Sequence, residues 1–135
     1  MKQKVDIKET QWFKPDDWSI RENKARKRGN QDKGSHPALA VGKNGKRIAN
    51  FGLSHNEKRG HHKNILLSQN PNPKDKKKAY IRDDLQFDDE KHLKQLLAGY
   101  RKLAPKDQQK VLEIINKKRQ SKKWLSLVLT LGGSN

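Results

Sequence analysis

Three histidines and three cations lie within nine residues of one another in the segment LSHNEKRGHHK, residues 53–63. An imidazole titrates near neutrality and can give or take a proton, while a cation stabilises the charge of a phosphate in a transition state. Cleavage of RNA by its own 2′-hydroxyl needs a base, an acid and such a cation. The candidates for catalysis are Ser54, His55, Arg59 and His62, with His36 upstream.

The same segment also fits a loop that only holds phosphates. Eleven Lys and Arg face two acids between Lys43 and Arg82, and the whole chain has a formal net charge of +17. A field of this sign attracts polyanions, so nucleic acid is the expected partner, RNA more than DNA. The cations expected to bind it are Lys43, Lys46, Arg47, Lys58, Arg59, Lys63, Lys76, Lys77 and Lys78, with Arg26 and Arg28 nearer the N-terminus.

The composition argues against several other classes of protein. The chain has no cysteine, and its histidines match no zinc spacing, so we expect neither a metal nor a cofactor. The N-terminus lacks the apolar core of a signal peptide, and nowhere do eighteen apolar residues follow one another. We therefore expect a cytoplasmic protein without a membrane partner.

The elements that position these residues begin with a predicted hairpin. Asn44-Gly45 between two apolar runs predicts a type I′ turn joining strands 38–42 and 47–53. Further strands are expected over 63–69 and 79–82. Short strands at this density predict a small bent antiparallel sheet or barrel over residues 36–82.

The flanking regions have a different character. Residues 1–35 carry ten Lys or Arg against six acids and predict a basic, flexible arm, with a helix from about Lys14 to just before Gly29. Leucines at helical spacing after Asp88, and a second apolar stripe after Pro105, predict a helical hairpin over 88–119. The acids of residues 83–90 either complement the helix dipole or seat the protein's own basic surface.

The C-terminal segment 124–131, WLSLVLTL, fits both a strand and a helix. Its alternation of leucine with Ser, Val and Thr favours a strand that pairs with the sheet. The predicted fold class is therefore α+β, with one domain over 36–135.

The run SHPALAVGKNGKRIANFGLSHNEKRGHHKNILL, about a third of the chain, resembles the core of the MazF/PemK-type endoribonuclease toxins and their ToxN/AbiQ-like relatives. The resemblance implies an SH3-like barrel, metal-independent cutting of single-stranded RNA and an antitoxin partner. Ser54 matches the family's hydroxyl residue, and Lys58 and Arg59 match its basic loop. His36 stands where many members have an arginine, and histidine is a poor substitute for bidentate phosphate binding.

Three functions remain open from the sequence. The first is a nucleic-acid-binding protein of a phage or mobile element, in which the histidines belong to a basic surface. The second is a metal-independent endoribonuclease of toxin–antitoxin type. The third is a protein-binding inhibitor of a nuclease complex.

Overall fold

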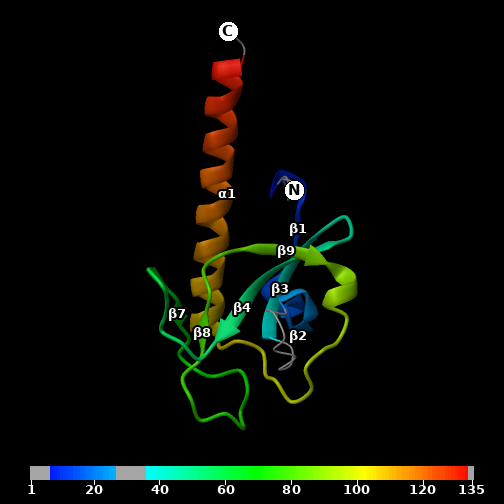
Figure 1. Ribbon diagram of the computed structural model, residues 1–135, viewed down its shortest axis with the longest axis vertical. Coiled ribbons are helices and arrows are strands. Elements are labelled where there is room, and N and C mark those ends of the chain that lie inside the picture. The colour runs from blue at the N-terminus through cyan, green and yellow to red at the C-terminus, as the bar shows by residue number, and fades with distance from the viewer. Residues whose placement is uncertain (1–6, 27–35, 134–135) are drawn as a thin grey trace.

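The computed structural model describes residues 7–26 and 36–133, which form an α+β fold. A curled antiparallel sheet makes a half-barrel, and one long helix lies beside it (Figure 1). The sheet strands are β1 (Gln11–Trp12), β2 (Ser19–Asn23), β3 (His36–Asn44), β4 (Arg47–Ser54), β7 (Ile65–Leu66), β8 (Tyr80–Ile81) and β9 (Gln86–Asp89). A separate two-stranded hairpin contains β5 (Lys58–Arg59) and β6 (His62–Lys63), and the helix is α1 (Pro105–Gly133).

The hairpin of β3 and β4, which the sequence predicted, lies at the centre of the sheet. Its turn differs by one residue, because Asn44 pairs with Arg47 and the two-residue loop is Gly45-Lys46. Gly45 has a φ of 57°, and no described residue other than glycine has a positive φ. The turn therefore uses one left-handed residue, and the expected type I′ turn at Asn44-Gly45 is wrong.

A bulge divides β3 between two neighbouring strands. The register with β4 shifts between Ala40 and Gly42, so Val41 is the extra residue. Residues on one side of the bulge pair with β2, and Gly42 and Lys43 on the other side pair with β1. A Cβ on Gly42 would lie 2.9 Å from the Gln11 carbonyl oxygen, so only glycine lets β1 approach this closely.

The described N-terminal residues belong to the sheet, which corrects the prediction of a flexible arm. Instead of a helix from Lys14, the chain forms one 3₁₀ turn at Pro15–Asp17 and then β2. Trp18 and Ile20 are buried in the main core, because β2 covers the edge of β3. Residues 1–6 and 27–35 lie outside the described part of the chain.

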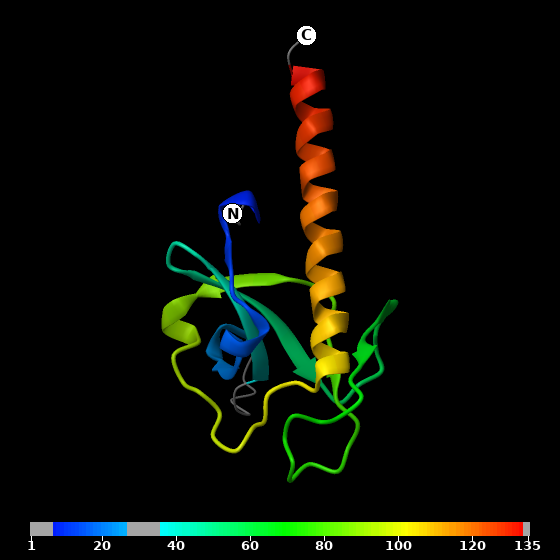
Figure 2. The same cartoon turned by 180° about the vertical axis from the view of Figure 1, so that it is seen from behind.

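Helix α1 closes the core at the other side of the sheet. Val111 and Ile115, one turn apart, pack into the cluster that contains Phe51 and Ile81. The helix begins at Pro105, which needs no hydrogen-bond partner for its nitrogen. Its C-terminal end extends past the sheet in both views (Figures 1 and 2).

Two predictions for the C-terminal half are wrong. Residues 88–119 do not form a helical hairpin: 86–89 are strand β9, Glu90–His92 is one 3₁₀ turn, and only α1 is a helix. The segment 93–97 instead bonds to the edge of β2, where the Leu97 amide donates to the Ile20 carbonyl at 3.1 Å and the Glu22 amide to the Gln95 carbonyl at 2.9 Å. The segment 124–131 is helical rather than a strand.

Candidate nucleic-acid interface

Strand β4 separates the predicted nucleic-acid-binding residues into two groups. Lys43, Lys46 and Arg47 lie at its first end, around the turn from β3. At its other end, about 23 Å away at roughly 3.3 Å per residue, the strand closes with the catalytic candidate Ser54, and His55 follows it. The structure therefore does not bring the predicted cations together on one site.

Acidic residues surround the group at the first end of β4. Lys43 Nζ lies 3.2 Å from a Glu90 carboxylate oxygen, and Arg47 is the register partner of Asp89. The Asp89 side chain also accepts a hydrogen bond from the Lys91 amide, which lowers the pKa of Asp89. Acids of the 83–90 segment thus lie beside the protein's own cations Lys43 and Arg47. This end of the sheet is therefore a poor site for a polyanion.

The β5–β6 hairpin at the other end places one pair of like charges, Lys58 and Lys63, opposite each other. Lys58 is the register partner of Lys63, and Arg59 is that of His62. Like charges directly across an antiparallel pair repel, so an anion bound between them would stabilise the hairpin. Gly60, with a φ of 60°, begins the tight turn that makes this arrangement possible.

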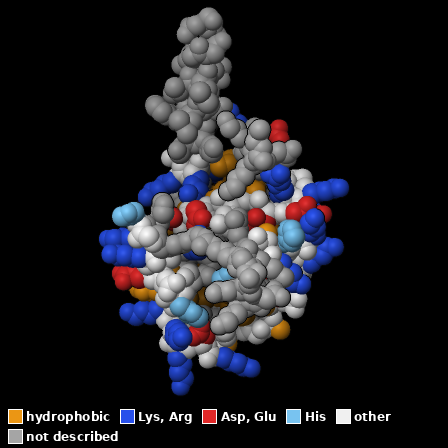
Figure 3. Space-filling view, in the orientation of Figure 1, with side chains coloured by type: hydrophobic (Ala, Val, Ile, Leu, Met, Phe, Trp, Pro, Cys, Tyr) orange, Lys and Arg blue, Asp and Glu red, His pale blue; other side chains and the backbone are white. Residues whose placement is uncertain are grey.

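The loop between β7 and β8 presents four exposed lysines: Lys74, Lys76, Lys77 and Lys78. Its backbone is braced by short-range hydrogen bonds. Asn70 Oδ1 accepts from the Asn72 amide and Asn72 Oδ1 from the Lys74 amide, at 2.9 and 3.1 Å. The Asn70 side chain then donates to the Lys77 carbonyl at 2.9 Å, closing the loop. Figure 3 shows Lys and Arg side chains projecting from the lower end of the molecule, where Figure 1 draws this loop.

His55 and Asp75 join this lysine loop to the end of β4. His55 Nε2 lies 2.5 Å from Asp75 Oδ2, and the His55 side chain is 54% exposed. The backbone amide of Lys77 donates to Asp75, and this bond, followed by the one to His55, lowers the pKa of the carboxyl. An ionised carboxylate accepts a hydrogen bond, so in the neutral imidazole Nε2 carries the proton and Nδ1 is left as an acceptor.

Asp75 was not among the predicted site residues. It lies twenty positions from His55 in the sequence, and no local spacing connects the two. The available signal was an isolated acid in the lysine run NPKDKKK, where a carboxylate without a structural partner would be out of place.

The other catalytic candidates are not arranged around the His55–Asp75 pair by any described contact. Ser54 Oγ accepts a hydrogen bond from the Asn56 amide at 3.0 Å and so shapes the turn after β4. His36 is exposed at the first residue of β3, at the end of the β3–β4 pair where Ser54 also lies. Arg59 and His62 are placed only by the backbone of their hairpin. Arg26 ends a 3₁₀ turn, and Arg28 lies outside the described residues.

Among the described side chains of residues 7–26 and 36–133, no group of three or more His, Cys, Asp or Glu is arranged to hold a metal ion. In the same ranges no helix is both long enough and apolar enough to cross a membrane. Comparison with protein-family models, with curated proteins and with solved structures gives no match to this chain.

Proposed function

We propose that this protein binds nucleic acid, RNA in preference to DNA, through the surface that follows β4. This basic surface is defined by Lys58 and Lys63 of the β5–β6 hairpin and by Lys74, Lys76, Lys77 and Lys78 of the lysine loop. The observation that carries the proposal is the like-charge register of the hairpin, where Lys58 stands opposite Lys63.

The balance of charge at the two ends of β4 supports this choice. Within the described part of the chain, none of the six lysines of the basic surface makes an ion pair, whereas Lys43 at the opposite end pairs with Glu90. Exposed cations without an ion pair can bind phosphates and release their counterions without first breaking a contact within the protein. A polyanion is therefore expected to bind more tightly at the basic surface than at the opposite end of β4.

The salt dependence of binding tests this proposal. Each neutralised phosphate of a single strand contributes about 0.7 to the slope of log affinity against log salt, so six lysines predict a slope of about −4. Replacing Lys76, Lys77 and Lys78 by Gln should reduce the magnitude of the slope by about 2. The matched control is the Lys43→Gln, Lys46→Gln variant, which should leave it nearly unchanged. A slope near zero for the wild type would rule the proposal out.

The His55–Asp75 pair favours a second candidate function, metal-independent cleavage of RNA. Asp75 holds the imidazole so that Nδ1 can accept the proton of a 2′-hydroxyl. The 2′-oxygen then attacks the adjacent phosphorus to form a 2′,3′-cyclic phosphate, and the expelled 5′-oxygen takes a proton from water. The lysine loop would supply positive charge next to the phosphorane. Such a reaction needs no nucleophile from the protein, in agreement with the engagement of Ser54 by Asn56.

Single-turnover cleavage of an RNA oligomer in EDTA, measured beside its binding isotherm, tests this second function. His55→Ala should lower the rate by about 10²- to 10⁴-fold with little change in affinity. Asp75→Asn should lower the rate less, because the amide still accepts a hydrogen bond but no longer favours the imidazolium. His61→Ala, in the same basic segment, serves as the control. Intact RNA at every pH, together with tight binding, would rule out cleavage and leave binding as the only function.

A further inference from the structure

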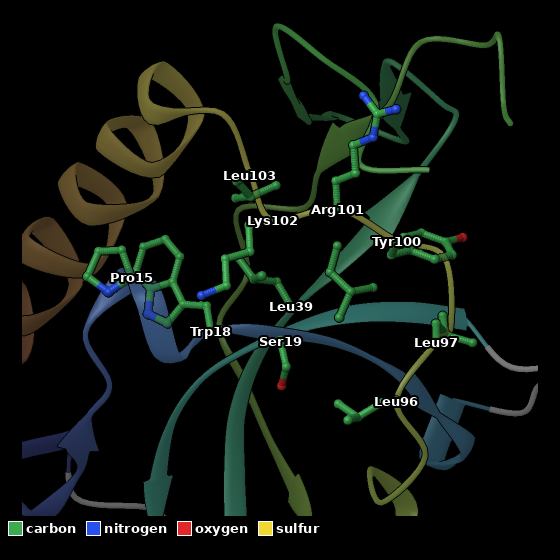
Figure 4. A pocket seen from close by; sticks show the side chains of 11 residues that line it. Pro15, Trp18, Ser19, Leu39, Leu96, Leu97, Tyr100, Arg101, Lys102 and Leu103 are labelled. Carbon is green, nitrogen blue, oxygen red and sulfur yellow. The ribbon is translucent and has the colours of Figure 1, made fainter. Parts of the chain in front are cut away.

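A pocket of about 220 Å³ lies between the N-terminal turn and the segment before α1 (Figure 4). Trp18, Leu39 and Leu103 form its buried part. Tyr100 and Leu97 line the other side, where Leu96 is 61% exposed. This volume is below the roughly 300–1,000 Å³ of pockets for drug-sized ligands, so it suits a single ring-sized group.

The walls of the pocket are held in place from two sides. The Trp18 indole N–H donates to the Phe13 carbonyl at 3.1 Å, which fixes the ring. Lys102 Nζ donates to the Asp16 carbonyl and so ties the segment before α1 to the N-terminal turn. The site is therefore formed in the protein before any ligand arrives.

Polar groups at the mouth remain available. Within the described residues, neither the Tyr100 hydroxyl nor the Arg101 guanidinium has a hydrogen-bond or ion-pair partner. Arg101 points away from Trp18 (Figure 4). A ligand with an apolar ring and polar edges would meet both kinds of group.

The pocket adjoins the basic surface. The Arg101 amide donates to the Pro71 carbonyl at 2.7 Å, and Pro71 belongs to the loop that carries Lys74, Lys76, Lys77 and Lys78. A polyanion on these lysines therefore has the mouth of the pocket within reach.

We propose that the pocket takes one unstacked base of a single-stranded nucleic acid whose phosphates lie on the lysine loop. This inference rests on the proposed function and extends it, since it makes single strands the preferred ligand. Single strands are commonly bound by basic grooves combined with aromatic platforms, here Tyr100. An apolar side chain of a protein partner would also fill the space, but it would not use the adjoining positive charge.

The test compares two ligands of equal charge, a uridine 12-mer and a 12-mer ribose-phosphate chain without bases. Their affinities are measured by fluorescence anisotropy at one salt concentration. One inserted base should make the uridine oligomer bind about 5- to 150-fold more tightly. Leu96→Asp, at the exposed edge of the pocket, should abolish that preference. Leu66→Asp is the matched control, because it adds the same charge at the other exposed large apolar residue of the described chain and should keep the preference.

Tyr100→Ala provides a second variant and should also remove the preference, provided its melting curve remains cooperative. Equal binding of both oligomers by the wild type, with a steep salt slope, would overturn the pocket assignment and leave the proposed function standing. Failure to bind either oligomer at low salt would overturn both. If base preference is absent and an acidic, leucine-containing peptide binds in a way that Leu96→Asp abolishes, the pocket belongs to a protein partner and the base assignment is wrong.

Discussion

At the scale of single residues, the ionised form of Asp75 connects three parts of the candidate interface. It accepts from the Lys77 amide and contacts His55, and both interactions lower its pKa from the ordinary value of 3.8. A carboxyl whose pKa is lower in the folded than in the unfolded state stabilises the fold above its unfolded pKa. That contribution disappears as the pH falls through the folded pKa.

We therefore predict that the closed form of the lysine loop is fully kept at pH 5 and is lost only below pH 3.8. The chemical shifts of the Lys77 amide and of the His55 ring, followed by NMR during acid titration, should report this change. In Asp75→Asn the Lys77 amide should show no such transition. A midpoint above 3.8 in the wild type would contradict the assigned contacts.

The sequence indicated His55 but not its partner Asp75, because only features of neighbouring residues can be read from the sequence. Imidazole chemistry can be read from a residue type, and a basic segment from its composition. The contact with Asp75 depends on how β4 and the lysine loop meet in three dimensions. The prediction from sequence likewise grouped Lys43 with Lys58, because a count of charges ignores the distance that the strand between them imposes.

At the scale of elements, a buried carboxylate connects α1 to the segment between β7 and the lysine loop. Asp107, fully buried, accepts from the Ser68 amide at 2.7 Å and from the Ser68 hydroxyl at 3.0 Å. It also accepts from the Gln69 amide at 3.3 Å. Removing the carboxylate would delete three hydrogen bonds to a charged acceptor, which are donated by the exposed residues Ser68 and Gln69.

Asp107→Ala should therefore lower the free energy of unfolding by about 1–3 kcal/mol. The measurement is urea denaturation followed by circular dichroism. Glu113→Ala, at an exposed position of the same helix, is the control and should change it by less than about 0.5 kcal/mol. Equal effects of the two changes would show that the Ser68 contacts do not matter for stability.

Two glycines of the central hairpin provide a matched pair for the close approach of β1. In Gly42→Ala the new Cβ would lie 2.9 Å from backbone oxygen of Gln11, so β1 must move. In Gly52→Ala the nearest atom, at 3.1 Å, is the Cδ of the Arg82 side chain, which can rotate away. We expect Gly42→Ala to lower the melting temperature clearly more than Gly52→Ala does. The opposite order would mean that β1 is not held against β3.

The elements that the sequence predicted correctly are those with a local cause. The β3–β4 hairpin follows from two apolar runs on either side of a glycine turn. The helix expected after Asp88 failed because Leu93 fills a small core with Ala38, Ala40 and Ile48, while Leu96 stays exposed. Helical spacing of leucines was present, but backbone hydrogen bonds to the edge of β2 replaced those of a helix.

At the scale of the whole molecule, the N-terminal segment completes the half-barrel. Composition made it resemble an arm, because its apolar residues are few and its cations many. Some of those residues are nevertheless buried: Trp18 is 5% exposed, and Ile20 belongs with it to the main core. A charged segment can thus be an integral part of a fold when it adds strands to a sheet edge, because backbone pairing and a few buried apolar side chains hold it there.

This placement predicts that Trp18→Ala destabilises the fold by about 3–5 kcal/mol, as expected for removing a large buried aromatic side chain. Thermal and urea denaturation measure the effect, and Lys14→Ala, at an exposed neighbouring position, is the control. A flexible arm predicts instead that both changes leave unfolding untouched and that only Lys14→Ala weakens nucleic-acid binding.

Deleting residues 1–23 is a second test of whether this segment is part of the sheet. Loss of β1 and β2 would uncover the long edge of β3, so we expect the product to aggregate. A soluble, cooperatively folded deletion variant would show that the fold does not need this segment, as expected for a flexible arm.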